Sequence, residues 1–214
     1  MKGLKKIFTG FLADKNLRYK RFPYEKENDM NSIDIMVEEH KNVKRMLVVI
    51  RKLCYKIIKS DEINYEDFYK VIDFVRNYAD KHHHGKEETM LFNRMTEELG
   101  AAAQKLVNQG MLVEHDLGRL YMRQLEVAVG KVLEGDDEAR VDVIGNAMSY
   151  ENLLNRHIDK EDNVVYKYAQ NNLSKATIEK IEEECEVFEK TPESNAARKK
   201  YLKMLADMEE KLLK

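Results

Sequence analysis

Apolar side chains recur along most of the chain with the period of an α-helix. The first such stripe begins after Ser32, a plausible N-cap, and its apolar positions follow one another at spacings of three and four residues. Later stripes stop before Gly100 and at Gly135, where a following aspartate completes a turn signal. The pattern predicts four long helices, at about 32–59, 64–98, 101–133 and 139–169.

Short turns between long helices make successive helices antiparallel neighbours, so the expected fold is an up-down-up-down four-helix bundle. Two further stripes, 174–190 and 192–214, predict extra C-terminal helices. Residues 1–26 hold eight basic and two acidic side chains around a few apolar ones. We expect three parts: a basic amphipathic N-terminal arm over 1–29, docked on the bundle or on a membrane surface or acidic partner; the bundle over 30–172; and a helical extension over 173–214.

The composition favours the same all-α class. Only 2 of the 214 residues are proline and 9 are glycine, while 36% are charged. Such a scarcity of helix breakers leaves little room for a turn-rich β fold.

The charge pattern and the apolar runs exclude several classes of protein. Residues 1–60 carry 15 basic and 7 acidic side chains, against 22 and 32 in the rest, and the net charge is −2, so no overall basic field argues for nucleic acid. The apolar runs are too short for a transmembrane segment, and the N-terminus lacks a secretory cleavage site. Cys54 and Cys185 are not in a CxxC pair and stand at apolar-periodic positions, so they are expected as reduced core thiols. We expect a cytoplasmic protein.

The informative exceptions are polar residues that stand where the helical stripes demand apolar ones. Unpaired, a carboxylate in such a position would cost several kcal/mol, roughly, so something must neutralise it. Residues four apart share one helix face, and each of the two H-x-x-x-E pairs therefore presents an imidazole and a carboxylate to one point. The candidate metal ligands are His40, His83, Glu87, His115, His157 and Glu161.

These candidates form an internal repeat. The two single histidines lie 75 residues apart and the two paired histidines 74, and the segments 83–92 and 157–166 share His, Lys at +3, Glu at +4, an acid at +5 and an aromatic at +9. A pseudo-twofold bundle of two helical hairpins would bring all six side chains together in its core. Six ligands of two types suit a pair of metal ions.

The ligand types narrow the choice of metal. Imidazole and carboxylate without thiolate favour iron or manganese over structural zinc. Two bridging carboxylates, four histidines and a bridging oxide or hydroxide leave each ion short of six bonds, and so with an open position. Four more carboxylates, at Glu39, Glu88, Glu114 and Asp162, could accept the imidazole protons.

The chain resembles the hemerythrin-like HHE cation-binding family over about residues 30–170. The resemblance rests on EEH ending at His40, on HHHGKEETMLF (82–92), on EHDLGR (114–119) and on HIDKEDNVVYKYA (157–169), in the family's order on four helices. It implies two non-haem iron ions, bridged by oxide or hydroxide and held by the six candidates. It also implies reversible binding or sensing of dioxygen, or handling of peroxide or nitric oxide.

Two positions bear on how far that resemblance extends. The oxygen carriers have a second histidine one turn before the third-helix ligand, where this chain has Met111. This difference favours redox turnover, sensing or storage over simple oxygen carriage as the function. Asp162 also matches the carriers' fourth-helix carboxylate, so Glu161 and Asp162 compete as the second bridge; Glu161 is favoured because it repeats the spacing of Glu87.

Other residues near the motifs are expected to play no part in the chemistry. His82 and His84 are expected to flank the ligand as spectators, and Tyr78, Tyr121, Tyr150 and Met122 to pack the core. Two functions stay open: a module that binds dioxygen or another small molecule, and an enzyme that reduces peroxide, dioxygen or nitric oxide with electrons from a partner protein. The first is slightly favoured because no electron-transfer motif is fused to the chain. A structural bundle with empty sites is a distant third, and the oligomeric state is left open.

Overall fold

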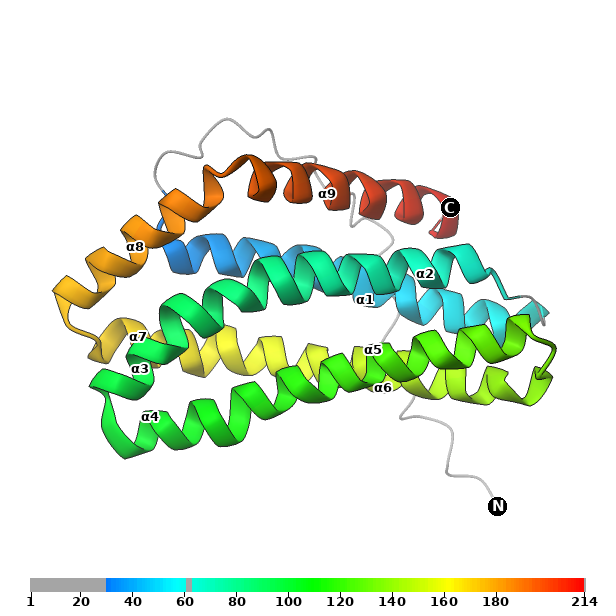
Figure 1. Cartoon of the computed structure of the whole chain (residues 1–214), viewed down its shortest axis with the longest axis horizontal. Coiled ribbons are helices and arrows are strands. Elements are labelled where there is room, and N and C mark those ends of the chain that lie inside the picture. Colours follow the sequence, from blue (N-terminus) through cyan, green and yellow to red (C-terminus); the bar gives the residue numbers. More distant parts are fainter. Residues whose placement is uncertain (1–29, 61–62, 214) are drawn as a thin grey trace, which may run out of the picture. The chain divides into compact units, whose positions relative to one another are not determined.

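The computed structural model describes residues 30–60 and 63–213, and in these ranges the chain is helical with short connections (Figure 1). The arm predicted over 1–29 lies outside the described residues. The elements in order are α1 (Ser32–Ser60), α2 (Tyr65–Phe74), η2 (Val75–His84), η3 (Glu87–Phe92), α3 (Asn93–Glu98), α4 (Gly100–Leu106), η4 (Val107–Met111), α5 (Leu112–Leu133), η5 (Asp137–Ala139), α6 (Arg140–Lys160), η6 (Glu161–Val165), α7 (Tyr166–Asn172), α8 (Lys175–Glu189) and α9 (Pro192–Leu212).

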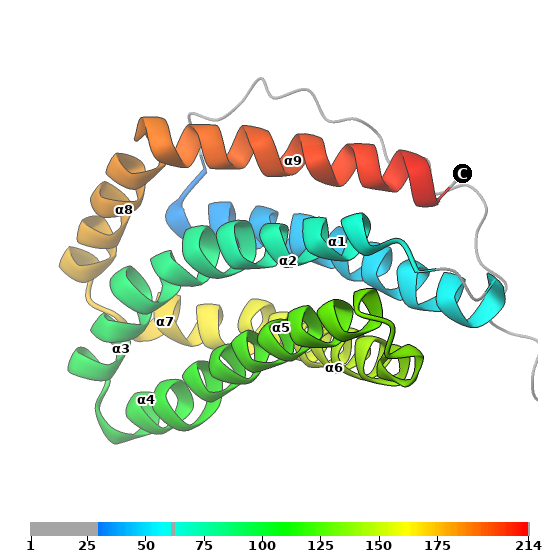
Figure 2. The same ribbon diagram turned by 45° about the vertical axis from the view of Figure 1, so that its right-hand side comes forward.

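These elements join into four long helical rods that run antiparallel, as predicted. The rods are α1; α2 to α3; α4 to α5; and α6 to α7, and α1 packs on α6 while α5 packs on both α6 and α2 (Figures 1 and 2). The all-α bundle is therefore confirmed, and its rods agree with the expected boundaries to within about three residues.

Glycine with a positive φ makes two of the turns. Gly100 has φ +70° between the second and third rods, and Gly135 has φ +102° between the third and fourth. An L side chain rarely adopts this left-handed conformation, which explains why the apolar stripes stop at these two residues.

The core has two apolar clusters with a polar layer between them. One cluster takes in Ile50, Phe68, Leu125 and Val143, and the other takes in Met36, Leu91, Val107 and Val165. On every rod the candidate ligands stand between residues of the first cluster and residues of the second. The bundle thus closes the polar layer at both ends with packed hydrocarbon.

The two C-terminal helices share this core. In α9, Tyr201, Leu205 and Met208 belong to the first cluster, and in α8, Ile181 belongs to the second. Figure 1 shows α9 lying along α1 and α2 and α8 turning down beside the end of the bundle. The boundary that we propose between bundle and extension, after residue 172, falls where α7 ends.

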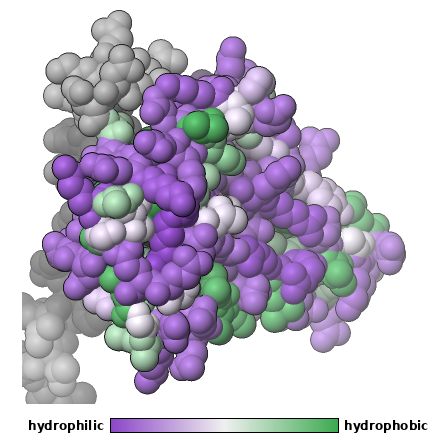
Figure 3. Space-filling model, turned by 60° about the vertical axis from the view of Figure 1, so that its left-hand side comes forward, coloured by the Kyte–Doolittle hydropathy of each residue, from purple (hydrophilic) through white to green (hydrophobic). Residues whose placement is uncertain are grey.

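None of the helices in the described ranges is long and apolar enough to cross a membrane. The face drawn in Figure 3 is mostly hydrophilic, with apolar residues in small separate patches. Cys54 and Cys185 are buried free thiols, as predicted.

Candidate metal centre

Two of the four rods, the second and the fourth, change to π-helical winding where they pass the polar layer, and the π-helical segment of the third rod ends at Met111, four residues before His115. His83 lies near the end of η2, Glu87 begins η3, and Glu161 begins η6. At the end of η2 the Gly85 N–H donates to the carbonyl of Asp80, five residues earlier. Such segments are rare and are frequently found at functional sites. The winding of these rods therefore marks the same layer as the H-x-x-x-E pairs.

The structure gathers His40, His83, Glu87 and Glu161 into one buried group. Each offers one ligand atom, and these four atoms all lie within 4.8 Å of one another. His40 Nε2 is 3.3 Å from Glu161 Oε2, and His83 Nε2 is 3.6 Å from Glu87 Oε2. We refer to this group as the first position.

A second group, next to the first, contains His84, His115 and His157, again with one ring nitrogen of each within 4.8 Å of the others. The Nε2 atoms of His115 and His157 are 3.1 Å apart. Both glutamates reach this group too: Glu87 Oε2 is 3.6 Å from His115 Nε2, and Glu161 Oε1 is 3.1 Å from His157 Nε2. The two carboxylates therefore lie between the first position and this second position.

Four more carboxylates hold the outer nitrogens of the imidazoles. The Nδ1 atoms of His83, His115, His157 and His40 lie 2.7–2.8 Å from carboxylate oxygens, and their respective partners are Glu39, Glu88, Glu114 and Asp162. Each contact joins one rod to the next, so the four of them close a ring around the bundle. A proton on Nδ1 shared with a carboxylate leaves Nε2 as the free acceptor, which is the tautomer that binds a metal.

Glu39 also lies in a buried ionic network with the C-terminal extension. Lys86 is fully buried, and its Nζ donates to Glu39 at 2.5 Å and to Glu189 of α8. His82 Nε2 lies 2.9 Å from Glu39. Glu39, His82 and Glu189 also come close enough together to hold a cation, but the Lys86 ammonium already lies against both carboxylates.

The inward atoms of the layer lack partners. Among the described residues, His83 Nε2, Glu87 Oε2 and both Oε atoms of Glu161 are buried and make no hydrogen bond, although the Nε2 atoms of His157 and His40 lie 3.1 and 3.3 Å from the Glu161 oxygens. Polar atoms this deeply buried are nearly always satisfied, and an orphaned group costs about 1–3 kcal/mol. Two nitrogens bound at right angles to one metal ion, each about 2.1 Å from it, would be about 3 Å apart, close to the His115–His157 spacing. These donors thus fit a pair of bound cations.

The electrostatics of the metal-free layer agree with that interpretation. Burial works against protonation of His40, but Asp162 and Glu161 outweigh it and raise its pKa to about 9. Burial likewise opposes charge on His157, while Glu161 and Glu114 raise its pKa to about 10. Burial and the charge of Glu161 together raise the pKa of Glu87 to about 8. Without a metal, the layer holds protons in the place of cations.

Tyr166 adds a hydroxyl to the first position. Its O–H donates to Glu87 Oε1 at 2.5 Å and lies 3.5 Å from His40 Nε2. The sequence showed only an aromatic residue at +9 from His157, where the other half of the repeat has Phe92. This difference between tyrosine and phenylalanine at equivalent positions of the repeat is the sequence signal that could have indicated a role for the Tyr166 hydroxyl.

The structure differs from the sequence-based expectation for two neighbouring histidines. The sequence predicts that His82 and His84 lie on the flanks of the helix, yet both are buried, with His82 in contact with Glu39 and His84 among the imidazoles of the second position. A π-helix has more residues per turn than an α-helix, so successive side chains diverge by a smaller angle. Three consecutive histidines can therefore all point inward.

Other residues singled out in the sequence pack in or against the two apolar clusters. Met111 is buried and belongs to the apolar cluster that also contains Phe92 and Tyr166. Tyr78 and Tyr150 are buried in the first cluster, as expected for core packing, and Tyr121 packs partly buried against it.

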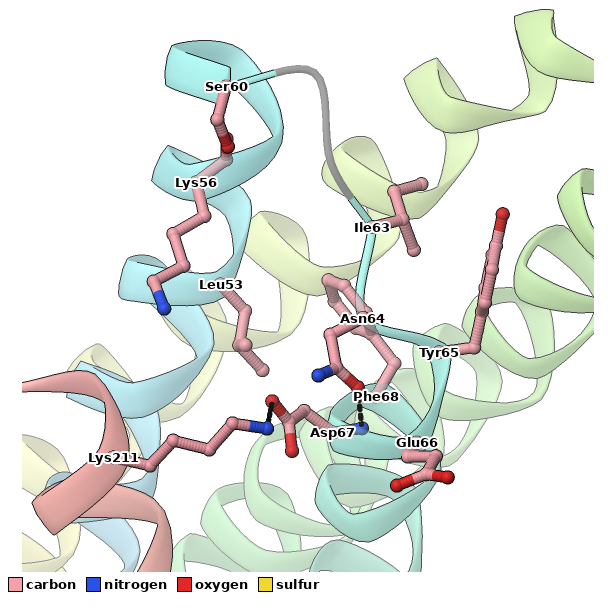
Figure 4. A pocket seen from close by; sticks show the side chains of 10 residues that line it. All are labelled: Leu53, Lys56, Ser60, Ile63, Asn64, Tyr65, Glu66, Asp67, Phe68 and Lys211. Atoms are coloured by element: carbon pink, nitrogen blue, oxygen red, sulfur yellow. Dashed lines mark hydrogen bonds and ion pairs between the residues drawn. The ribbon is translucent and has the colours of Figure 1, made fainter.

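Of two hollows in the described part of the chain, one reaches the polar layer and the other lies away from it. One of about 270 Å³ is lined in part by Asp80, His84, His115, Arg119 and Tyr150, and so reaches the second position. The other, of about 610 Å³, lies near the connection between α1 and α2, where Lys211 pairs with Asp67 at 2.7 Å (Figure 4). The residues that line it include none of the candidate ligands.

Residues 31–169 match the hemerythrin HHE cation-binding domain. The chain belongs to this family. No curated protein and no solved structure gives a match. The matched range begins just before α1 and ends in α7, so the hemerythrin domain comprises the four rods and the whole polar layer.

Proposed function

We propose that this hemerythrin-domain protein holds two non-haem iron ions, bridged by oxide or hydroxide, and binds dioxygen or a related small molecule for sensing, storage or transport. His40 and His83 would hold one ion and His115 and His157 the other, with Glu87 and Glu161 between them. The observation that carries the proposal is the set of buried donor atoms on His83, Glu87 and Glu161 that face this layer and make no hydrogen bond among the described residues.

The donor chemistry supports iron. The layer offers imidazole nitrogens and carboxylate oxygens, and the thiols of Cys54 and Cys185 are in neither group of candidate ligands. Nitrogen and oxygen donors suit iron and manganese, whereas structural zinc sites favour cysteine. Two buried free thiols also fit the reducing cytoplasm, in which we propose that the protein works.

The residues of the chain would prepare the layer for a small ligand. A pair of ferrous ions supplies the electrons with which dioxygen can be bound. The ring of four carboxylates keeps every Nε2 atom turned inward, and the apolar clusters above and below exclude bulk water. The hollow beside His115 gives a small molecule a path from the surface to the second position.

A second function, the reduction of peroxide, dioxygen or nitric oxide with electrons from a partner protein, is favoured by one observation. The Tyr166 hydroxyl touches both Glu87 and His40, and so can hold or pass a proton at the first position. Reduction of hydrogen peroxide to two waters consumes two protons and two electrons, and the electron-donor protein would supply the electrons.

The two functions are separated by adding each oxidant to the anaerobically prepared ferrous protein. Dioxygen uptake of about one molecule per iron pair, reversed by degassing, supports the binding function. Repeated consumption of hydrogen peroxide in the presence of an electron donor supports the enzyme. A protein that carries two iron ions and does neither would contradict both.

A further inference from the structure

The two metal positions differ in their surroundings. The first has His40 and His83 with the Tyr166 hydroxyl 3.5 Å from His40 Nε2, and the second has His115 and His157. Met111, one turn before His115, offers a thioether, which is a soft donor among hard ones and binds iron weakly. The second position would then have two imidazoles unless another residue adds a third.

His84 lies against this position. Its ring stacks on the His115 ring, with centroids 3.8 Å apart and planes 8° from parallel, and it meets the His157 ring edge-on at 5.8 Å. A ring nitrogen of His84 is within 4.8 Å of ring nitrogens of both. Only 6% of the residue is exposed, so this imidazole stays inside the layer.

The surroundings of His84 repeat those of the other four histidines. Its Nδ1 faces Asp80 Oδ1 at 3.4 Å, as each of the other Nδ1 atoms faces a carboxylate. Asp80 is held in turn by Arg119, whose Nε donates to the same oxygen at 2.9 Å. A carboxylate behind Nδ1 fixes the ring so that its other nitrogen is free for a metal. Asp80 and Arg119 thus extend the ring of supports to a fifth imidazole.

We propose that His84 is a fifth imidazole ligand, which completes the second position beside His115 and His157. The assignment rests on the proposed di-iron function. It makes two adjacent residues on one helix serve different metal ions, His83 the first and His84 the second. The π-helical winding of η2 allows this because neighbouring side chains diverge less than on an α-helix.

The hollow beside His84 provides a direct test. His84 and His115 both line it, and its volume of about 270 Å³ exceeds that of an imidazole molecule. Replacing His84 by alanine would join the vacated space to this hollow, so that free imidazole could enter and replace the missing ring. A glutamine at the same position would remove the ligand and also fill the space.

The experiment loads the full chain with two equivalents of Fe²⁺ under anaerobic conditions. A ferrous chelator is then titrated in, and the iron retained and the Mössbauer spectrum are measured. For His84→Ala we expect one of the two ions to be held at least about 10-fold more weakly, since even outer partners of a ligand contribute 10–100-fold. Millimolar imidazole should restore this ion in His84→Ala and not in His84→Gln. Met122→Ala, which also enlarges the hollow but removes no nitrogen, should keep both ions.

The outcomes separate this assignment from the function on which it rests. If His84→Ala and His84→Gln release iron at the wild-type chelator concentration with unchanged Mössbauer spectra, His84 is a stacking partner only and the assignment is wrong. If wild type itself does not retain two iron ions, the di-iron proposal fails, and the assignment of His84 to an iron fails with it. The glutamine variant decides the matter if the alanine variant does not fold.

Discussion

Four imidazoles of the layer, those of His40, His83, His115 and His157, are each oriented by a carboxylate from another rod. Glu39 stands next to His40 in the sequence but contacts His83, and Asp162 follows Glu161 but contacts His40. A contact between rods fixes both the ring orientation and the packing of the two helices, whereas a contact within a rod would fix only the ring. The geometry of the metal centre and the register of the bundle therefore depend on the same bonds.

The hydroxyl of Tyr166 should contribute measurably to stability. Tyr166→Phe leaves Glu87 Oε1 without its donor, and we expect the metal-free protein to lose about 1–3 kcal/mol of unfolding free energy. Tyr150→Phe is the matched control, because the Tyr150 hydroxyl is buried and has no partner among the described residues. That variant should be neutral or slightly more stable. Urea unfolding of both variants checks the difference, and equal losses would show that the bond to Glu87 contributes nothing.

Single residues show how far the sequence alone could lead. Repeat spacing favoured Glu161 over Asp162 as the bridging carboxylate, and the structure turns Glu161 toward both groups of imidazoles and Asp162 toward His40 Nδ1. The choice of Glu161 as a metal bridge stays a prediction. The inward placement of His84 could not be foreseen, because an α-helical period places residues next to the ligand on the flanks.

At the scale of elements, the helices could be predicted from the sequence, but their π-helical segments could not. Apolar periodicity and two glycines located the four rods. The i, i+3, i+4 pattern of apolar residues carries no sign of the π-helical segments η2, η3, η4 and η6. Sequence therefore predicted which helices meet, and the structure was needed to show which neighbours of each ligand also face inward.

The turn between the third and fourth rods requires its glycine. At Gly135 an added Cβ would meet nothing within 4 Å, but φ is +102°, so Gly135→Ala should cost about 1–2 kcal/mol through the backbone alone. Gly130→Ala, inside α5 and also free of contacts, should instead stabilise the protein by about 0.5–1 kcal/mol. Thermal unfolding of the two variants should give shifts of opposite sign. Shifts of the same sign would contradict this account of the turn.

At the scale of the whole molecule, a charged layer divides a hydrophobic core. Packed hydrocarbon at both ends makes this layer costly without bound cations, and the C-terminal helices add to the packing on the outside. The Lys86 ammonium links Glu189 of α8 to Glu39, and through Glu39 to His83. The extension is therefore linked to His83 of the first metal position through three successive contacts.

Metal and protons should compete for this layer. The pKa values of His40, His115 and His157 are raised to between about 9 and 10 in the metal-free protein, and that of Glu87 to about 8, so near pH 7 metal uptake should release about four protons per chain. Because the three histidine pKa values are raised, the histidines' contribution to metal-free stability is complete below about pH 6.5 and is lost as the pH rises through 9–10. Metal affinity should rise over the same range.

Proton release can be followed with an indicator dye in weakly buffered solution, and stability by thermal unfolding with and without metal. The metal-free protein should become less stable from pH 7 to 10, while the stabilisation by metal increases. Metal uptake without proton release, or metal-free stability that rises with pH, would contradict the charge arrangement described for the layer.

The most direct test of the di-iron centre is the iron content of the purified protein and of four variants after iron-replete expression. We expect about two iron ions per chain in wild type. Glu87→Ala and Glu161→Ala should lose both ions together, because each carboxylate would serve two, whereas His40→Ala and His115→Ala should lose mainly one. One zinc ion or no metal in wild type, or equal loss of a single ion in all four variants, would contradict a carboxylate-bridged pair of iron ions.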